Sequence, residues 1–222
     1  MSVDTQGRLT TLTETAYNEV HPWGSALRRG NNLQESIQDQ ESTATRIRIF
    51  QPSVVPGLLQ TAEYARRVIA MFHGQYSDTE PAAEIASRLN RQLALYETDR
   101  HFEFLITEAA LRWRPGPLRL LLAQLHHIAS LSTLDNVRIG LIPLGIEATT
   151  LNTHGFALYE GGGQDAWASV ETIHAEMKVS APEHLDVYRS RWSRLCESAL
   201  VDEPAQEFLS GLVTELRAAS AQ

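Results

Sequence analysis

The sequence contains one cysteine, Cys196, among its 222 residues. A disulfide-linked scaffold and a cysteine-rich zinc site are therefore excluded. Residues 1–9 lack the apolar segment of a secretory signal, and the chain has no run of about 18 apolar residues that would span a membrane. Because thiols stay reduced in the cytosol, we expect a cytoplasmic protein that does not interact with membranes.

Motifs for cofactor, metal and covalent chemistry are also missing. Gly161, Gly162 and Gly163 precede a predicted strand rather than a helix, so they indicate a hairpin tip and not a phosphate-binding loop. The eight histidines show no His-Glu-x-x-His spacing, and no Gly-x-Ser-x-Gly turn occurs. We therefore expect no metal and no cofactor.

Basic residues are outnumbered in this chain. Its 19 Lys and Arg stand against 27 Asp and Glu, which gives a formal charge of −8. Non-specific binding to nucleic acid depends on clustered cations that neutralise phosphates. The charge balance therefore predicts no direct binding to nucleic acid.

Apolar residues make up 43% of the chain, enough for one large core. Residues 1–45 are polar and show little helical periodicity. We interpret them as a partly ordered N-terminal arm with a short helix near residues 33–40, and we expect Trp23 to dock on the domain. Residues 46–222 are predicted to form a single α/β domain.

Short apolar runs predict strands, at residues 46–50, 102–106, 137–142, 156–160 and 167–173. Apolar stripes at helical spacing predict helices, at residues 61–72, 79–96, 118–128, 180–199 and 202–216. Strands and helices do not alternate strictly, so a doubly wound parallel sheet is not expected. The prediction is an α+β fold, in which a mixed or antiparallel sheet of about five strands packs with about five helices.

Two carboxylates lie at or in predicted strands. Glu108 follows strand 102–106, and Arg112 comes four residues later, so the two can form an ion pair if this stretch is helical. Such a pair would make Glu108 structural, whereas an unpaired Glu108 would face a ligand. Glu171 is the second carboxylate, and two inward carboxylates with different pKa values would suit acid–base chemistry.

Two arginines share one face of a predicted helix. Arg88 and Arg91 are three residues apart, with Gln92 beside them. They form either a solvated stripe or a socket for an acidic partner or ligand group.

Several short sequence motifs occur in order along the chain: Val55-Pro56-Gly57-Leu58-Leu59-Gln60-Thr61 followed by Glu63-Tyr64-Ala65-Arg66, then Arg88-Leu89-Asn90-Arg91-Gln92, Thr107-Glu108-Ala109-Ala110-Leu111-Arg112, and Val170-Glu171. Over residues 46–216 the chain resembles the domain of unknown function that follows the Xre-type helix-turn-helix in a large group of actinobacterial regulators. The resemblance implies a sensor or effector domain that binds a small molecule or a small partner protein, and it supplies no catalytic residues.

The candidate ligand-binding residues are taken from the positions that match these motifs. They are Gln60, Thr61, Tyr64, Arg91, Gln92, Glu108 and Arg112. Glu171 matches the group as well.

Two features depart from that group of regulators. Residues 1–45 are too short and too aperiodic for a helix-turn-helix unit, so we expect no DNA-reading element in the chain. The loop at residues 144–154 also differs from the Gly- and His-containing loop that the group tends to have. We expect any difference in ligand to arise at this loop.

Three functions remain open. The first, favoured by the resemblance and the missing catalytic motifs, is a module that binds a small molecule or a small partner protein. The second is a cofactor-independent cyclase, isomerase or lyase of natural-product biosynthesis, with Glu108, Glu171, His154 and Tyr64 as acid–base candidates. The third is a scaffold or homodimer formed through the apolar faces of the last two predicted helices.

Overall fold

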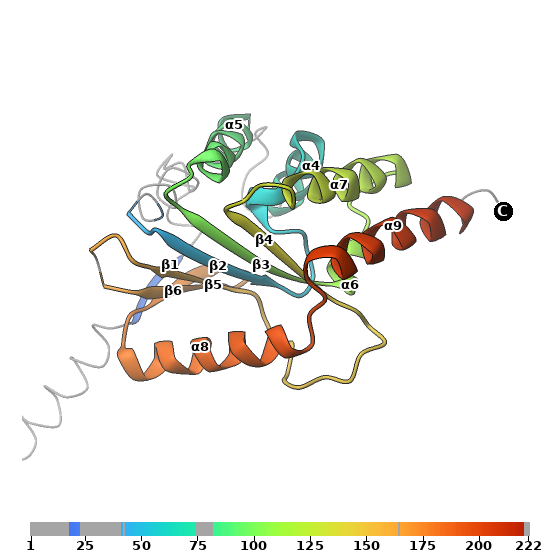
Figure 1. The fold of residues 1–222 in the computed structure, drawn as a ribbon. Coiled ribbons are helices and arrows are strands. Elements are labelled where there is room, and N and C mark those ends of the chain that lie inside the picture. The colour runs from blue at the N-terminus through green and yellow to red at the C-terminus, as the bar shows by residue number, and fades with distance from the viewer. Residues whose placement is uncertain (1–17, 23–40, 42, 74–81, 164, 220–222) are drawn as a thin grey trace, which may run out of the picture.

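A mixed sheet of seven strands lies between two layers of helices (Figure 1). The computed structural model describes residues 18–22, 41, 43–73, 82–163 and 165–219. The helix expected at 33–40 and the docking of Trp23 fall outside these residues. The strands are β1 (Asn18–Pro22), β2 (Arg46–Gln51), β3 (His101–Thr107), β4 (Val137–Ile142), β5 (Phe156–Glu160), β6 (Trp167–Glu171) and β7 (Ala175–Val179).

Strand β2 divides the sheet into two halves. The strand order is β1-β7-β6-β5-β2-β3-β4. On one side β2 pairs in parallel with β3, which pairs in parallel with β4. On the other side β2 pairs antiparallel with β5, and the pairs from β5 to β1 are all antiparallel. The predicted mixed sheet is confirmed.

The predicted number of strands was too low, because β1 and β7 were not expected. Strand β1 lies inside the segment interpreted as an arm, and its Val20 is exposed, so it has no apolar alternation to reveal it. Strand β7 follows β6 through a tight turn, in which Thr172 makes backbone and hydroxyl hydrogen bonds to Ala175. The sequence pattern assigned this turn to the end of one strand.

The helices agree closely with the apolar stripes. The described α-helices are α4 (Ala62–His73), α5 (Ala82–Arg91), α6 (Glu108–Arg112), α7 (Leu118–Leu131), α8 (Pro182–Glu197) and α9 (Asp202–Ala219), with short 3-10 helices η1 (Gly57–Leu59) and η2 (Gln92–Tyr96). The unexpected helix is α6, whose five residues are too few to show a period. None of the described helices combines the length and the apolar character that crossing a bilayer requires.

Two apolar cores form, one on each face of the sheet. Helices α4, α5, α7 and α9 lie on one face, and α8 lies on the other (Figure 1). Because successive strand residues point to opposite faces, Ile47 and Ile49 of β2 enter the first core while Phe50 enters the second. Trp192 of α8 is buried in the second core.

Gln124 of α7 holds the connection between β2 and α4 in place. Its side chain is fully buried. The amide nitrogen donates to the carbonyl of Leu59 at 2.6 Å, and the amide oxygen accepts from the backbone N–H of Thr61 at 2.7 Å. Two backbone groups that helices leave unpaired are satisfied in this way.

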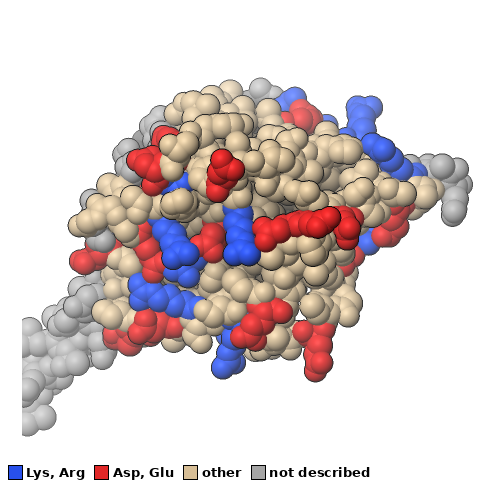
Figure 2. Space-filling model, in the orientation of Figure 1, with Lys and Arg blue, Asp and Glu red and all other residues tan. Residues whose placement is uncertain are grey.

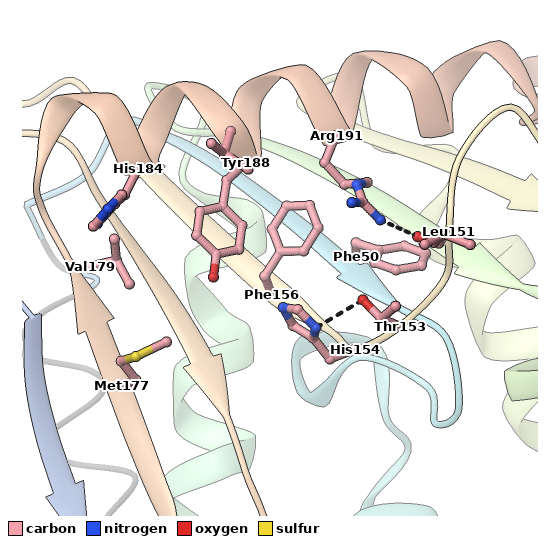
Figure 3. Close-up of a pocket in the computed structure, with 11 residues that line it drawn as sticks. Phe50, Leu151, Thr153, His154, Phe156, Met177, Val179, His184, Tyr188 and Arg191 are labelled. Atoms are coloured by element: carbon pink, nitrogen blue, oxygen red, sulfur yellow. Dashed lines mark hydrogen bonds between the residues drawn. The ribbon is translucent and has the colours of Figure 1, made fainter.

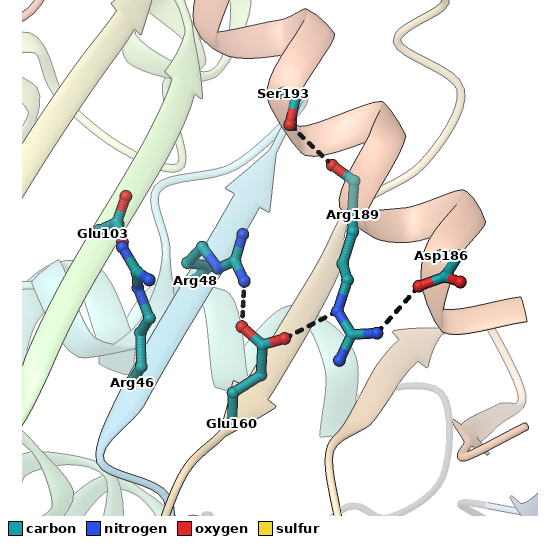
Figure 4. A network of polar contacts seen from close by, with 7 residues as sticks. All are labelled: Arg46, Arg48, Glu103, Glu160, Asp186, Arg189 and Ser193. Atoms are coloured by element: carbon teal, nitrogen blue, oxygen red, sulfur yellow. Dashed lines mark hydrogen bonds and ion pairs between the residues drawn. The ribbon is translucent and has the colours of Figure 1, made fainter. Parts of the chain in front are cut away.

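Helix α8 is held to the sheet by the ionic network of Figure 4. Glu160 of β5 accepts hydrogen bonds from Arg48 of β2 and from Arg189 of α8. Arg189 also bonds Asp186, and the guanidinium of Arg48 lies 5.9 Å from the ring of Trp192. Burial opposes ionisation of Glu160, but the bonds from the two arginines outweigh it and lower its pKa.

We predict that Gln124→Met lowers the free energy of unfolding by about 2–4 kcal/mol, because it leaves the Leu59 carbonyl and the Thr61 amide without their partner. Urea unfolding measures the change. The matched control is Gln206→Met at an exposed position of α9, which should alter stability by no more than about 0.5 kcal/mol. Equal effects of the two substitutions would contradict the role of Gln124.

We predict that Glu160→Gln destabilises the fold at pH 7 by about 1–3 kcal/mol, because the half-buried guanidinium of Arg48 loses its carboxylate. The pKa of Glu160 is lower in the folded state, so its contribution is present at neutral pH and is lost as the pH falls through that pKa. The difference between wild type and variant should therefore shrink in acid.

The control for Glu160→Gln is Glu63→Gln, since Glu63 pairs with Arg66 and Arg67 on the exposed face of α4. Exposed pairs contribute little, so a change of about 0.5 kcal/mol or less is expected. A pH-independent loss of stability in Glu160→Gln would show that charge is not its cause.

Candidate functional site

A hollow of about 760 Å³ opens on the face that carries α4 and α5. Its floor comes from β5, β6 and β7, and its walls come from α4, α5 and residues 51–60. The volume falls within the roughly 300–1,000 Å³ that is typical of small-molecule sites.

The floor takes its polar groups from alternate strand residues. In β6, Ala168 and Val170 point into the core beneath α8, while Ser169 and Glu171 line the hollow. Glu176 of β7 lines it too and accepts a hydrogen bond from the hydroxyl of Ser169. Ser169 and Glu176 are both buried.

One wall contains a buried ion pair between Glu41 and Arg91. The guanidinium donates twice to the carboxylate, at 3.0 and 2.7 Å, and the hydroxyl of Tyr159 donates to the same carboxylate at 3.0 Å. The Tyr159 ring stacks on Trp167 with centroids 4.0 Å apart. Burial, together with the charge of Glu41, raises the pKa of Tyr159 well above its usual value, so this hydroxyl is a donor.

The opposite wall is ordered by two glutamines. Gln60 donates to the carbonyl of Val55 at 2.8 Å and accepts from Arg88 at 3.0 Å. Gln92 donates to the backbone carbonyls of Gln60 and Gly57, at 2.6 and 3.2 Å. Burial and the neighbouring Arg91 lower the pKa of Arg88 to about 10, so Arg88 remains a cation at neutral pH.

Glu171 lies at the end of β6, within the hollow, and it has no hydrogen-bond partner among the described residues. Solvent reaches its carboxylate through the opening, although protein surrounds it on the other sides. The loss of hydration raises its pKa, Arg88 acts in the opposite direction, and Glu176 adds to the increase. Such a carboxylate is suited to pair with a cationic ligand group or to exchange a proton with a bound molecule.

The hollow brings together four of the predicted site residues, Gln60, Arg91, Glu171 and His154. Arg88 joins them, so both arginines of the predicted pair line the hollow. Among the described residues, no group of three or more His, Cys, Asp or Glu is arranged to hold a metal ion.

Three other candidates support the walls without lining the hollow. Thr61 caps α4 by accepting from the backbone N–H of Tyr64 at 3.3 Å. Tyr64 is fully buried, its ring lies edge-on to Trp113, and burial raises its pKa to about 12. Gln92 holds η1 through its two carbonyl contacts.

Glu108 and Arg112 form the ion pair that their spacing predicts, and they lie outside the hollow. Arg112 donates to Glu108 at 2.6 Å, and Glu108 also accepts from the backbone N–H of Leu144 at 2.8 Å. Arg112 makes two further bonds to Glu215 of α9. Glu108 is therefore fully engaged in joining α6 to the loop after β4, and it does not share a cavity with Glu171.

Polar lining residues that were not predicted from the sequence include Glu41, Glu84, Tyr159, Ser169 and Glu176. Glu41 lies in the segment interpreted as an arm. Ser169 shares the period-two pattern of Glu171, so strand alternation alone could have identified it. Glu176 required the pairing of β6 with β7, which is not visible in the sequence.

We predict that Glu171→Gln raises the free energy of unfolding at pH 7. The pKa of Glu171 is higher in the folded than in the unfolded state, so wild-type stability falls as the pH rises from the ordinary value of 4.5 through the raised one. Below about pH 4 the carboxyl is protonated in both states, and the advantage of the variant should disappear. Urea unfolding at a series of pH values, with the exposed Glu147→Gln as control, measures this; a variant less stable than wild type at pH 7 would contradict it.

Comparisons with known proteins show what the chain is similar to. No curated protein matches it significantly in sequence. Similar solved structures include NucT from Helicobacter pylori (12% identity, TM-score 0.46, covering 82% of this chain and 97% of that one) and Nuc, a phospholipase D family member from Salmonella typhimurium (12%, 0.40, 83% and 97%). The archaeal chromatin protein TrmBL2 is also similar (8%, 0.39, 89% and 62%). A family model matches residues 34–211, and the chain therefore belongs to the family described as domain of unknown function DUF5753.

Proposed function

We propose that this domain is a ligand-binding effector module whose binding site is the hollow over β5, β6 and β7. The proposal rests on one observation: sequence motifs that lie far apart along the chain line the same cavity. Gln60 comes from the motif at residues 55–61, Arg88 and Arg91 come from the motif at residues 88–92, and Glu171 comes from the end of β6. These motifs are among those through which the chain resembles the sensing half of Xre-type regulators.

The charges of the lining favour a ligand that carries a basic group. In the part of the chain that the structure describes, four glutamates line the hollow, Glu41, Glu84, Glu171 and Glu176, against the two arginines Arg88 and Arg91. Arg91 is already paired with Glu41, and Glu176 is bonded to Ser169. Glu171 is the carboxylate best placed to receive a cation, while Arg88 and Gln60 are placed to orient hydroxyl or carbonyl groups.

The resemblance to regulators suggests how binding would be used. In this proposal the ligand orders the walls of the hollow, and the altered surface is read by a separate DNA-binding partner. The face in Figure 2 shows Lys and Arg interspersed with Asp and Glu rather than gathered in one basic area. Such a surface supports recognition of a protein rather than direct contact with nucleic acid.

Thermal unfolding with small cations tests the proposal. Spermidine, agmatine, glucosamine and choline are the probes, and acetate and glucose provide anionic and neutral comparisons. At least one cation should stabilise the domain, by about 2.7 kcal/mol when present at roughly 100 times its Kd. Titration calorimetry then gives the affinity.

Variants locate the binding. Glu171→Gln should weaken the cation at least tenfold, because the ligand loses a charge-assisted bond. Glu147→Gln removes the same charge from an exposed loop position and should leave the affinity unchanged. If none of the cations binds, or if both variants weaken binding equally, the proposed site is wrong.

A further inference from the structure

A second pocket lies on the opposite face of the sheet, beneath α8 (Figure 3). Its volume is about 350 Å³. Helix α8, strands β2, β5 and β7, and the segment 151–156 supply its walls. Among the described residues, it shares with the hollow residues 153, 154 and 156, where the chain entering β5 passes the edge of both cavities.

The inner wall of this pocket is aromatic and apolar. Phe156 is central, with its ring centroid 5.7 Å from that of Phe50 and 5.2 Å from that of Tyr188. Both pairs are tilted, which is a favoured aromatic geometry. Met177 and Val179 of β7 complete the surface on the strand side (Figure 3). A planar ring or a short aliphatic chain would replace water against this wall at a gain in free energy.

The polar groups around the pocket are cationic or neutral. Arg191, His154 and His184 belong to the lining, and none of its described residues is Asp or Glu. Arg191 donates to the carbonyl of Leu151 at 2.6 Å through one terminal nitrogen, and its remaining N–H groups have no partner among the described residues. His154 accepts or donates through Nδ1 to Thr153 at 3.0 Å, which directs its other nitrogen away from that bond.

We infer that this pocket binds a small apolar molecule that carries one carboxylate, with its ring or chain against Phe156 and Tyr188 and its anionic group towards Arg191 and His154. The charge of this lining is opposite to that of the hollow, where glutamates predominate. The inference therefore does not rest on the proposed function, and the two sites would select ligands of opposite charge.

Four probes test the charge preference, 1-naphthoate and octanoate against 1-naphthylmethylamine and octylamine. Each amine has the ring or chain type of its acid and one methylene more, which favours the amine, so tighter binding of the acid reports on the charged group. Titration calorimetry should show the acids binding at least tenfold more tightly than the amines. Equal affinities would overturn the inference, as would the absence of binding by either acid at millimolar concentration.

Substitutions on α8 test whether the acid binds in this pocket. Arg191→Gln should weaken 1-naphthoate about tenfold, whereas Arg194→Gln, the same change at an exposed position on the same helix, should have no effect. Val187 lines the pocket and is 61% exposed, so Val187→Glu should fold normally. The added carboxylate should weaken 1-naphthoate and strengthen 1-naphthylmethylamine.

Each variant has an outcome that decides between explanations. An equal loss of affinity in Arg191→Gln and Arg194→Gln would place the acid elsewhere. An unchanged affinity in Val187→Glu, with a thermal midpoint like that of wild type, would also refute this pocket. Glu171→Gln should leave 1-naphthoate binding unaltered, so a failure of this site is distinguishable from a failure of the proposed cation site.

Discussion

The arrangement of the whole domain depends on the two different pairings of β2. This strand is parallel to β3 and antiparallel to β5. Parallel strands need crossover connections, and the crossovers here place α4, α5 and α7 above one half of the sheet. In the antiparallel half, short connections join β5 to β6 and β6 to β7, and neither contains a described helix. The hollow lies over the antiparallel strands, next to the strand where the pairing changes, which is a common location for ligand sites in α/β folds.

Charged side chains are organised differently in the hollow and in the attachment of α8. In the attachment, Glu160 is neutralised by Arg48 and Arg189, and its pKa falls. In the hollow, Glu171 remains without a bonded cation, and its pKa rises. A closed network of the first kind stabilises packing. A desolvated carboxylate of the second kind is a cost to folding that a bound cation would remove, which is a property expected of a ligand site.

The elements were more predictable than the site. Long helices such as α7 and α9 bury a stripe that shows in the sequence, and their apolar residues enter the predicted core. Helix α6 has five residues, too few to display a helical period, and Val20 of strand β1 is exposed, so no apolar alternation marks that strand. Among the site residues, Glu108 illustrates the difficulty: its spacing to Arg112 identified the ion pair, but only the position of the Leu144 backbone showed that both carboxylate oxygens are engaged.

The sequence by itself determined the mixed α and β composition and the separation of Arg88 and Arg91 from Glu171 along the chain. It also contains the motifs through which the chain resembles a regulator domain. These are local properties, set by periodicity and residue type. The tertiary structure decided which charges meet. Glu41 reaches Arg91 across 50 residues, and Tyr159 reaches Glu41 across 118. Contacts at such separations follow from strand order and helix placement, which depend on the packing of the entire core rather than on any one segment.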